Sequence, residues 1–323
     1  MTAASLRSTL RTTIMPWRYH LLLLLGAFTG GWASILGRMA QGEGVPTVYI
    51  IAFRQLMSAL VLTPFVLHYY RAELGQLRRR EILFAAIAGF WFAIHLLIGV
   101  EGLKHTSVLV NMVLGGTSPL WIALLEVSLM KHRFSKWVWI GLLFTLGGSI
   151  IIALGGGNSG LGDNPGLGSL LSIGAAVTGS LYAIMGRESR KRLSFMPYIW
   201  MVFSFAAATS LIVVVFTGTP VSGYSVAGYI DLALLVLLPQ LVGHLIYNYV
   251  LRHLSATYTA IVGQFGVIMS VVLAFFIFSE VPGALQLLLK LSQLQPTTLQ
   301  LLYIGFFSQP AFSGSFTILS KPP

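Results

Sequence analysis

Three polar side chains recur at intervals of four residues inside an otherwise apolar stretch in the last third of the chain. They are Gln240, His244 and Asn248. A spacing of four places side chains along one face of an α-helix. Together they supply amide donors, amide acceptors and an imidazole, which could bind a polar solute or pass protons. Such side chains also form hydrogen bonds between packed membrane helices, so the spacing leaves both roles open.

A second histidine, His95, lies near the middle of another apolar stretch, and Trp91 precedes it by one helical turn. A single histidine in a membrane span is often a satisfied structural group. Two histidines at related depths, His95 and His244, instead predict a shared central cavity. Trp91 could give that cavity a flat apolar wall, and helix packing is its alternative role.

A third ionisable group, Arg54, lies about five residues inside its apolar stretch. A charge at the centre of a membrane helix costs roughly 2.5–3.5 kcal/mol on insertion scales, so it needs a partner or a cavity. We expect a structural ion pair with Glu101, which lies at a similar depth on the next stretch. Two alternatives remain open: the Arg54 guanidinium could extend outward to the lipid headgroups, or it could contact an anionic substrate. Glu126 is a candidate for proton coupling or for interfacial anchoring.

The stretches that position these residues are membrane spans by composition. Of 323 residues, 56% are hydrophobic and 9% are charged, whereas a soluble domain has about 25% charged residues. The apolar residues come in blocks of about 20, the length that crosses a bilayer. The sequence therefore predicts an all-α, polytopic membrane helical bundle. Its nine clear spans are expected at 19–38, 48–69, 82–103, 108–130, 137–155, 167–187, 197–217, 229–251 and 256–279.

The net charge of +11 is concentrated in short loops between these spans. Of the 20 Lys and Arg residues, 15 fall on one side of the alternating spans, and only Arg38 and Lys104 fall on the other. This bias predicts a multi-pass protein of the cell membrane with a cytoplasmic N-terminus, and the compact loops fit a bacterial inner membrane. It explains the basic charge without a nucleic-acid partner. The absence of cysteine excludes disulfides and thiolate metal sites.

Two segments match later segments at nearly the same offset, which indicates an internal repeat. Residues 29–38 match 178–187 at an offset of 149, and residues 103–107 match 251–255 at an offset of 148. Arg38 and Arg187 fall on opposite sides of the membrane, as five helices per repeat require. Inverted repeats are typical of secondary transporters, whose binding site lies near the membrane midplane. We predict a first repeat at 1–155, a second at 156–288 and a separate tail at 289–323.

Several short motifs match a known pattern. They are Arg54 early in the second span, Gly102-Leu-Lys-His-Thr-Ser107, Pro119, Arg133-Phe-Ser135 with Gly141, Tyr247-Asn-Tyr-Val-Leu-Arg252 and Ser279-Glu-Val281. With these motifs, over roughly residues 20 to 288, the chain resembles the EamA-like, ten-helix branch of the drug/metabolite transporter superfamily. The resemblance implies an exporter or exchanger of amino acids, other small metabolites or toxic compounds.

The pattern ends at Leu288. The resemblance implies an apolar tenth span from about residue 289, but residues 289–298 read Leu-Lys-Leu-Ser-Gln-Leu-Gln-Pro-Thr-Thr. The apolar run that follows, 301–307, is too short to cross about 30 Å of hydrocarbon. We predict an altered C-terminal tail, and a poorly patterned tenth helix is the alternative.

The sequence carries no Walker A motif and no H-E-x-x-H or G-x-S-x-G motif. We therefore expect a secondary transporter that is not an enzyme, works by alternating access and needs no cofactor. Its small-molecule substrate would contact the candidate residues introduced above: His95, Gln240, His244, Asn248, Trp91 and Arg54. The lipid bilayer is its other partner, while proton coupling and a homodimer stay open. The alternatives are an inactive or structural relative with an aberrant tail, and a membrane-embedded enzyme.

Overall fold

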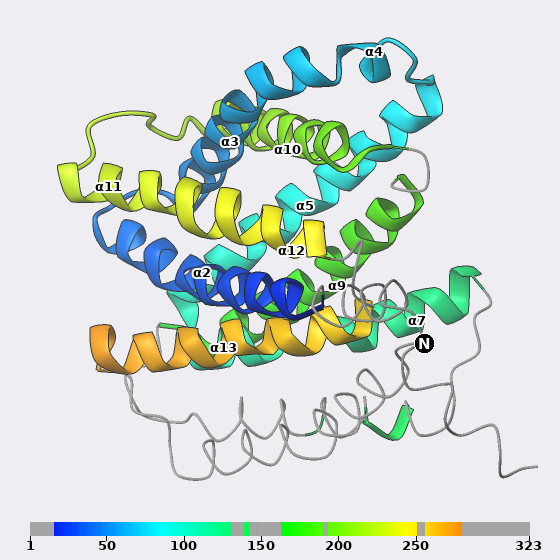
Figure 1. Ribbon diagram of the computed structural model, residues 1–323. Coiled ribbons are helices and arrows are strands. Elements are labelled where there is room, and N and C mark those ends of the chain that lie inside the picture. The colour runs from blue at the N-terminus through cyan, green and yellow to red at the C-terminus, as the bar shows by residue number, and fades with distance from the viewer. Residues whose placement is uncertain are drawn as a thin grey trace, which may run out of the picture.

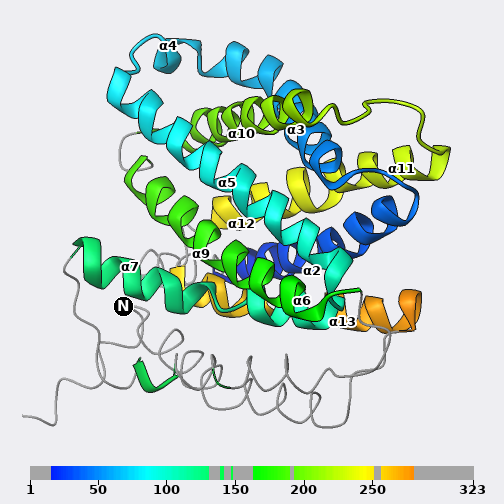
Figure 2. The same ribbon diagram turned by 180° about the vertical axis from the view of Figure 1, so that it is seen from behind.

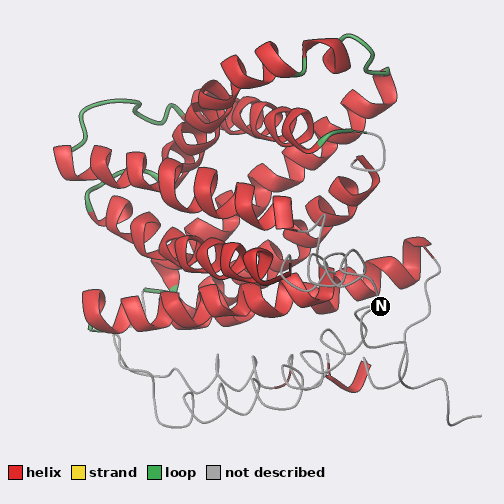
Figure 3. Cartoon of the chain, viewed as in Figure 1, coloured by secondary structure: helices red, strands yellow, loops and turns green. Residues whose placement is uncertain are grey.

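The structure, a computed structural model, describes residues 16–130, 139–141, 147, 163–189, 193–250 and 256–279. Its elements in these residues are helices, with no strand among them (Figures 1 and 3). They are α2 (Pro16–Gly42), α3 (Thr47–Tyr69), α4 (Arg71–Leu74), α5 (Arg79–His105), α6 (Val108–Gly115), α7 (Ser118–Met130), α9 (Pro165–Ser189), α10 (Phe195–Thr217), α11 (Val226–Leu235), the π-helix η1 (Val236–His244), α12 (Leu245–Val250) and α13 (Ala256–Phe278).

Within the described residues, seven helical segments are long and apolar enough to cross a membrane. They are Arg18–Gly42, Thr47–Tyr69, Arg79–His105, Val108–Ser128, Pro165–Gly186, Phe195–Thr217 and Val226–Tyr247. These spans confirm the predicted polytopic helical bundle. Most of the predicted span 137–155 and all of the tail 289–323 lie outside the described residues, so a count of nine or ten spans stays a prediction.

The helices pack in two matching sets. Helix α2 lies against α13 and against the segment α11–η1–α12, whereas α9 lies against α6 and α7 and against α5 (Figures 1 and 2). In the predicted repeat, α9 is the counterpart of α2, α6–α7 of α13, and α5 of α11–η1–α12. Each helix of one set therefore packs as its counterpart does, which is the arrangement that two related repeats produce.

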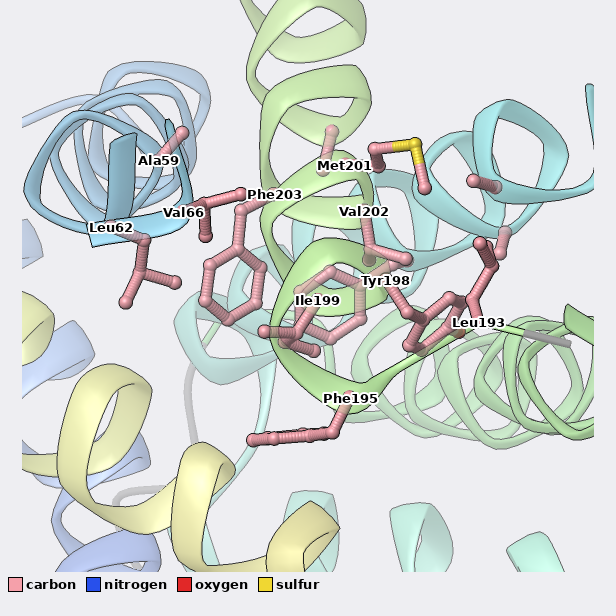
Figure 4. Close-up of a cluster of buried hydrophobic side chains, with 14 of the residues drawn as sticks. Ala59, Leu62, Val66, Leu193, Phe195, Tyr198, Ile199, Met201, Val202 and Phe203 are labelled. Atoms are coloured by element: carbon pink, nitrogen blue, oxygen red, sulfur yellow. The ribbon is translucent and has the colours of Figure 1, made fainter. Parts of the chain in front are cut away.

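The largest apolar cluster joins α3, α5 and α10. It centres on Tyr198, Ile199 and Phe203 of α10, which are all within 1% of full burial (Figure 4). Helix α5 approaches α10 closely because Gly89 has no side chain, and a Cβ there would lie 2.6 Å from the Cβ of Phe205. The cluster fixes the position of α3 and α5, which carry Arg54 and His95.

Polar contacts tie helices together at both ends of the bundle. At one end, here called the Glu43 end, the Glu43 carboxylate accepts a hydrogen bond from the Ser225 hydroxyl at 2.5 Å. At the same end His105 lies 2.8 Å from Asp163, and this hydrogen bond holds the pKa of the Asp163 carboxyl below its ordinary range. At the opposite end, the Glu73 carboxylate accepts from the backbone N–H of Ser194 at 2.7 Å.

The predicted fourth span is interrupted in the structure. Helix α6 ends at Gly115 and α7 begins at Ser118. Glycine is a poor helix former, and the buried hydroxyl of Thr117 donates to the Leu114 carbonyl at 2.6 Å, which competes with helical hydrogen bonding. The Ser118 carbonyl at this break accepts from Ser180 of α9 at 3.1 Å. Such donors are needed because no water satisfies freed backbone groups inside a bilayer.

The predicted eighth span is also not a regular α-helix. Its centre, Val236–His244, is a π-helix that contains Pro239. Proline lacks the N–H for the usual i→i−4 hydrogen bond, and its ring clashes with the preceding turn, so a wider local turn relieves both. π-Helical turns are rare and are frequent at functional sites. The candidate residues Gln240 and His244 both lie in this segment.

Candidate functional site

A chain of three hydrogen-bonded side chains crosses the interior between α3 and η1. The Arg54 guanidinium donates through Nε to the side-chain oxygen of Gln240 at 2.6 Å. The amide nitrogen of Gln240 then donates to the side-chain oxygen of Gln55 at 3.1 Å. Arg54 is 5% exposed, and Gln55 and Gln240 are fully buried. Because Arg54 is the eighth residue of α3, it lies about 10 Å along the helix from its start.

The donors and acceptors among these three hydrogen-bonded side chains can be assigned from chemistry alone. Arginine only donates, so the atom of Gln240 that faces Arg54 must be the oxygen. The other end of that amide, its nitrogen, must then face an oxygen of Gln55. This leaves the amide nitrogen of Gln55 as a buried donor without an acceptor among the described residues. A buried donor without an acceptor costs about 1–3 kcal/mol.

His95 is held by the neighbouring helix α9. Its Nδ1 lies 2.7 Å from the carbonyl oxygen of Ala175, which can only accept, so Nδ1 carries the proton. In a neutral His95, Nε2 is therefore left as an acceptor. The ring fits against Gly179, where a Cβ would lie 2.9 Å from Nδ1. Glycine at this position makes room for the imidazole between α5 and α9.

His244 lies among aromatic side chains of three other helices. Its Nε2 is 3.0 Å from the hydroxyl of Tyr182, within hydrogen-bond distance. The ring centroid of Phe92 lies 5.1 Å from that of His244 and 6.4 Å from that of His95, so Phe92 contacts both histidines. Arg54, Gln55, His95, Tyr182, Gln240 and His244 are called the central polar cluster below.

The structure thus brings four of the six predicted site residues together: Arg54, His95, Gln240 and His244. Trp91 lies edge-on to Phe90, with ring centroids 5.2 Å apart, and has no described contact with the central polar cluster. The backbone of Asn248 lies in α12, but its side chain is outside the described part of the structure.

The predicted ion pair between Arg54 and Glu101 is wrong. Glu101 lies near the end of α5, where it pairs with Lys104 at 3.0 Å and hydrogen-bonds Thr47, the first residue of α3. Arg54 is seven residues further along α3, two helical turns deeper, so Glu101 cannot reach it. The sequence suggests a similar membrane depth for Arg54 and Glu101, but the observed helix ends place them at different depths.

The candidate residues predicted from the sequence include neither Gln55 nor Tyr182. Gln55 directly follows Arg54, and a glutamine inside an apolar span is itself a signal for a buried hydrogen-bond network. Tyr182 gives a weaker signal, because a tyrosine in an apolar span can serve packing alone. Its contact with His244 joins α9 to η1, and the two residues are 62 positions apart in the sequence.

The arrangement can bind and orient a polar solute. It combines guanidinium and amide donors with imidazole nitrogens, and the buried ring of Phe92 packs near both histidines. Tyr182, His95 and His244 are partly exposed although they lie between helices. The cluster also spans both predicted repeats, because α3 and α5 precede residue 155 and α9 and η1 follow it.

Comparisons with known proteins agree on one class. The chain is 24% identical over 266 residues to the uncharacterized transporter YdfC of Bacillus subtilis, covering 80% of this chain and 83% of that protein. It is 23% identical over 203 residues to solute carrier family 35 member G1 of Mus musculus, covering 60% of this chain and 54% of that protein.

A solved crystal structure matches with a TM-score of 0.61 at 16% identity and covers 89% of this chain and 98% of its own. At that identity the likeness shows a shared fold. The sequence profile of the EamA-like transporter family matches twice, over residues 17–154 and 166–294, which supports two copies of one unit. The chain belongs to the EamA-like transporter family and is a membrane transporter of small solutes.

Proposed function

We propose that the chain is a secondary transporter that exports or exchanges a metabolite, an amino acid or a toxic compound by alternating access. The observation that carries this proposal is the hydrogen-bonded chain from Arg54 through Gln240 to Gln55. It joins helices of both repeats deep inside the bundle. Secondary transporters built from repeats hold their substrate at such an interface and expose it to each side in turn.

We further propose that the protein spans the cell membrane with its N-terminus in the cytoplasm. The loop-charge bias supports this orientation. The Glu43 end would then face outward, and the end with Glu73 and Ser194 would face the cytoplasm. In the described state both ends carry polar ties between helices. Alternating access requires the ties at one end to break when the site opens there.

Proton coupling through the histidines is a part of this proposal. A histidine titrates near neutral pH more readily than any other side chain. His244 has Tyr182 as a hydrogen-bond partner, and His95 retains Nε2 as an acceptor. A proton that enters the cluster would change its charge and with it the affinity for a charged solute.

The test is flux of a labelled panel of amino acids and other metabolites in proteoliposomes, with and without an imposed proton gradient. Wild-type protein is compared with His244→Ala and with empty liposomes. Flux above the empty liposomes supports transport, and loss of its gradient dependence in His244→Ala supports proton coupling. No flux of any compound from monodisperse protein would contradict the proposal and favour an inactive relative.

A further inference from the structure

The central polar cluster contains a cation without a described counter-ion. Seven of the nine acidic residues have described side chains, and none of these forms an ion pair with Arg54. The nearest acidic group expected from the sequence, Glu101, is engaged by Lys104 and His105 instead. A buried charge in a membrane protein normally pairs with another charge or faces the transported solute.

The donors of Arg54 are also largely unused. A guanidinium carries five N–H groups, and only the Nε group has an acceptor among the described residues. The two terminal nitrogens are therefore available to a planar group with two oxygens, which they can bind in a bidentate manner.

An independent observation indicates the same ligand chemistry. The amide nitrogen of Gln55 is a fully buried donor without an acceptor in the described structure. It belongs to the same hydrogen-bonded chain as Arg54, through Gln240. Arg54 and Gln55 thus present unused donors and one positive charge without a described counter-ion. An anionic ligand with oxygen acceptors would accept from these donors and balance the charge.

We propose that the transported solute carries a carboxylate, which binds to Arg54 and accepts a hydrogen bond from Gln55. This inference rests on the proposed transport function and specifies its substrate class. It excludes purely cationic drugs as substrates, because a second positive charge beside Arg54 would be repelled in a medium of low dielectric constant.

The experiment compares matched acids and amides in wild-type proteoliposomes: labelled L-phenylalanine with L-phenylalaninamide, and 3-phenylpropionate with its amide. We expect flux of an acid to exceed that of its amide by roughly tenfold or more, the effect of losing a charge-assisted hydrogen bond. Arg54→Gln should reduce this acid-to-amide ratio to about one. Arg18→Gln removes the same charge from an exposed site and should leave the ratio unchanged.

Each outcome has a separate meaning. Equal flux of acids and amides in wild-type protein, or preference for the amides, overturns the carboxylate inference while transport stands. No flux of any of the four compounds overturns the carboxylate inference, and the wider metabolite panel then decides the proposed function independently. If Arg54→Gln does not fold, thermal stabilisation of the wild type by the acids but not by the amides still tests the inference.

A second inference rests on different residues, at the end of the bundle with α4. An apolar pocket of about 290 Å³ lies between the α4–α5 segment and α10. It is lined by Leu74, Leu77, Ile82, Trp200, Met201, Ser204 and Phe205. The α4–α5 segment beside it carries four exposed arginines, Arg71, Arg78, Arg79 and Arg80, against two glutamates.

Both glutamates of this segment are engaged in hydrogen bonds. Glu73 accepts from the Ser194 backbone and Glu81 from the Arg78 backbone. Tyr69, which is 67% exposed, precedes the loop, as interfacial aromatic residues do at the headgroup level. An apolar pocket beside exposed arginines at this level fits one molecule that is both apolar and anionic.

We propose that an anionic phospholipid of the cytoplasmic leaflet binds here, with one acyl chain in the pocket and its phosphate on the arginines. In detergent, phosphatidylglycerol should raise the melting temperature of the protein more than phosphatidylcholine does. The triple variant Arg78→Gln, Arg79→Gln, Arg80→Gln should lose this difference. The control triple variant Arg7→Gln, Arg11→Gln, Arg18→Gln removes the same charge at other positions of the sequence and should keep this difference.

Equal stabilisation by the two lipids, or a difference that survives in the first triple variant, overturns the proposal. Glycerol phosphate separates the lipid from a free phosphate: if it stabilises the protein as well as the lipid does, the acyl chain is not bound and the lipid proposal fails. Ser204→Phe, which fills the pocket, should reduce the effect of phosphatidylglycerol without removing any charge.

Discussion

The guanidinium of Arg54 and the side-chain oxygen of Gln240 lie 2.6 Å apart, although 186 residues separate them in the sequence. The bond joins α3 to the π-helix η1. Because Gln240 is the only described acceptor for a buried cation, it stabilises the charge of Arg54 and links helices from both repeats.

Replacement of Gln240 should separate stability from substrate binding. Gln240→Leu removes the acceptor and should lower the free energy of unfolding by about 1.5–3 kcal/mol, because a charged donor loses its hydrogen bond. Gln240→Glu restores an acceptor and supplies a counter-charge. Its free energy of unfolding should therefore exceed that of the Leu variant by at least that amount. The same carboxylate should compete with an acidic solute and weaken its transport. Thermal unfolding and flux measure the two effects, and equal melting temperatures for the two variants would contradict this role.

A disulfide across the Glu43 end should block the transport cycle. A Cβ built on Gly228 lies 3.3 Å from the Cβ of Glu43, close to the 3.5–4.5 Å found in disulfides. The chain has no cysteine, so Glu43→Cys with Gly228→Cys gives one defined pair. Oxidised protein should lose flux, and a reductant should restore it.

The two single-cysteine variants are the controls for this lock, since each carries one of the local changes without the cross-link. The Gly228 variants share a close contact with the Val45 side chain, 3.0 Å from the added Cβ. Full flux in the cross-linked protein would mean that α2 and α11 do not separate at this end.

Gly179→Ala should disturb His95 directly. The added methyl group would lie 2.9 Å from Nδ1 and displace the ring from the Ala175 carbonyl, at a cost of about 1–3 kcal/mol for overpacking. Gly174→Ala, on the same helix, meets only the flexible end of Ile98 at 3.2 Å and is the matched control. Both variants are compared by melting temperature and flux. An equal effect of the two would show that His95 is not held by this contact.

Tyr182→Phe tests the hydrogen bond to His244. The ring of Tyr182 packs 4.7 Å from Phe92, and phenylalanine keeps this contact while losing the hydroxyl. Stability should fall by only about 1 kcal/mol. If His244 passes protons, the pH dependence of flux should shift, because the imidazole has lost the hydrogen bond to the Tyr182 hydroxyl. An unchanged pH profile would assign Tyr182 to packing alone.

The sequence was sufficient for the membrane class and the family, since apolar blocks and loop charges are properties of local composition. It also selected Arg54, His95, Gln240 and His244, because polar residues in apolar spans are conspicuous. It could not supply their partners, since those depend on how distant helices pack. Arg54 was assigned to Glu101 by depth, but the helix ends place Gln240 within reach instead.

The breaks within spans were harder to foresee. Gly115 and Gly116 with Thr117, and Pro239, are visible in the sequence, but both spans pass every test of length and hydropathy. Membrane helices also tolerate glycine and proline without breaking, so residue type alone does not decide. Whether a helix breaks depends on whether a neighbouring side chain can donate to the backbone carbonyl that the break leaves unpaired, as Ser180 does to the Ser118 carbonyl.

Helices α2 and α13 touch through small residues: the hydroxyl of Ser270 donates to the Gly31 carbonyl at 2.7 Å, and a Cβ on Gly31 would lie 2.8 Å from the Gly266 carbonyl. These partners are 239 residues apart. At a synthesis rate of about 5–20 residues per second, the surface that α13 covers on α2 is without it for roughly 10–50 s after α2 is made. Helix α2 is therefore fully packed only late in synthesis, and lipid or the insertion machinery must cover its small-residue face until α13 is made.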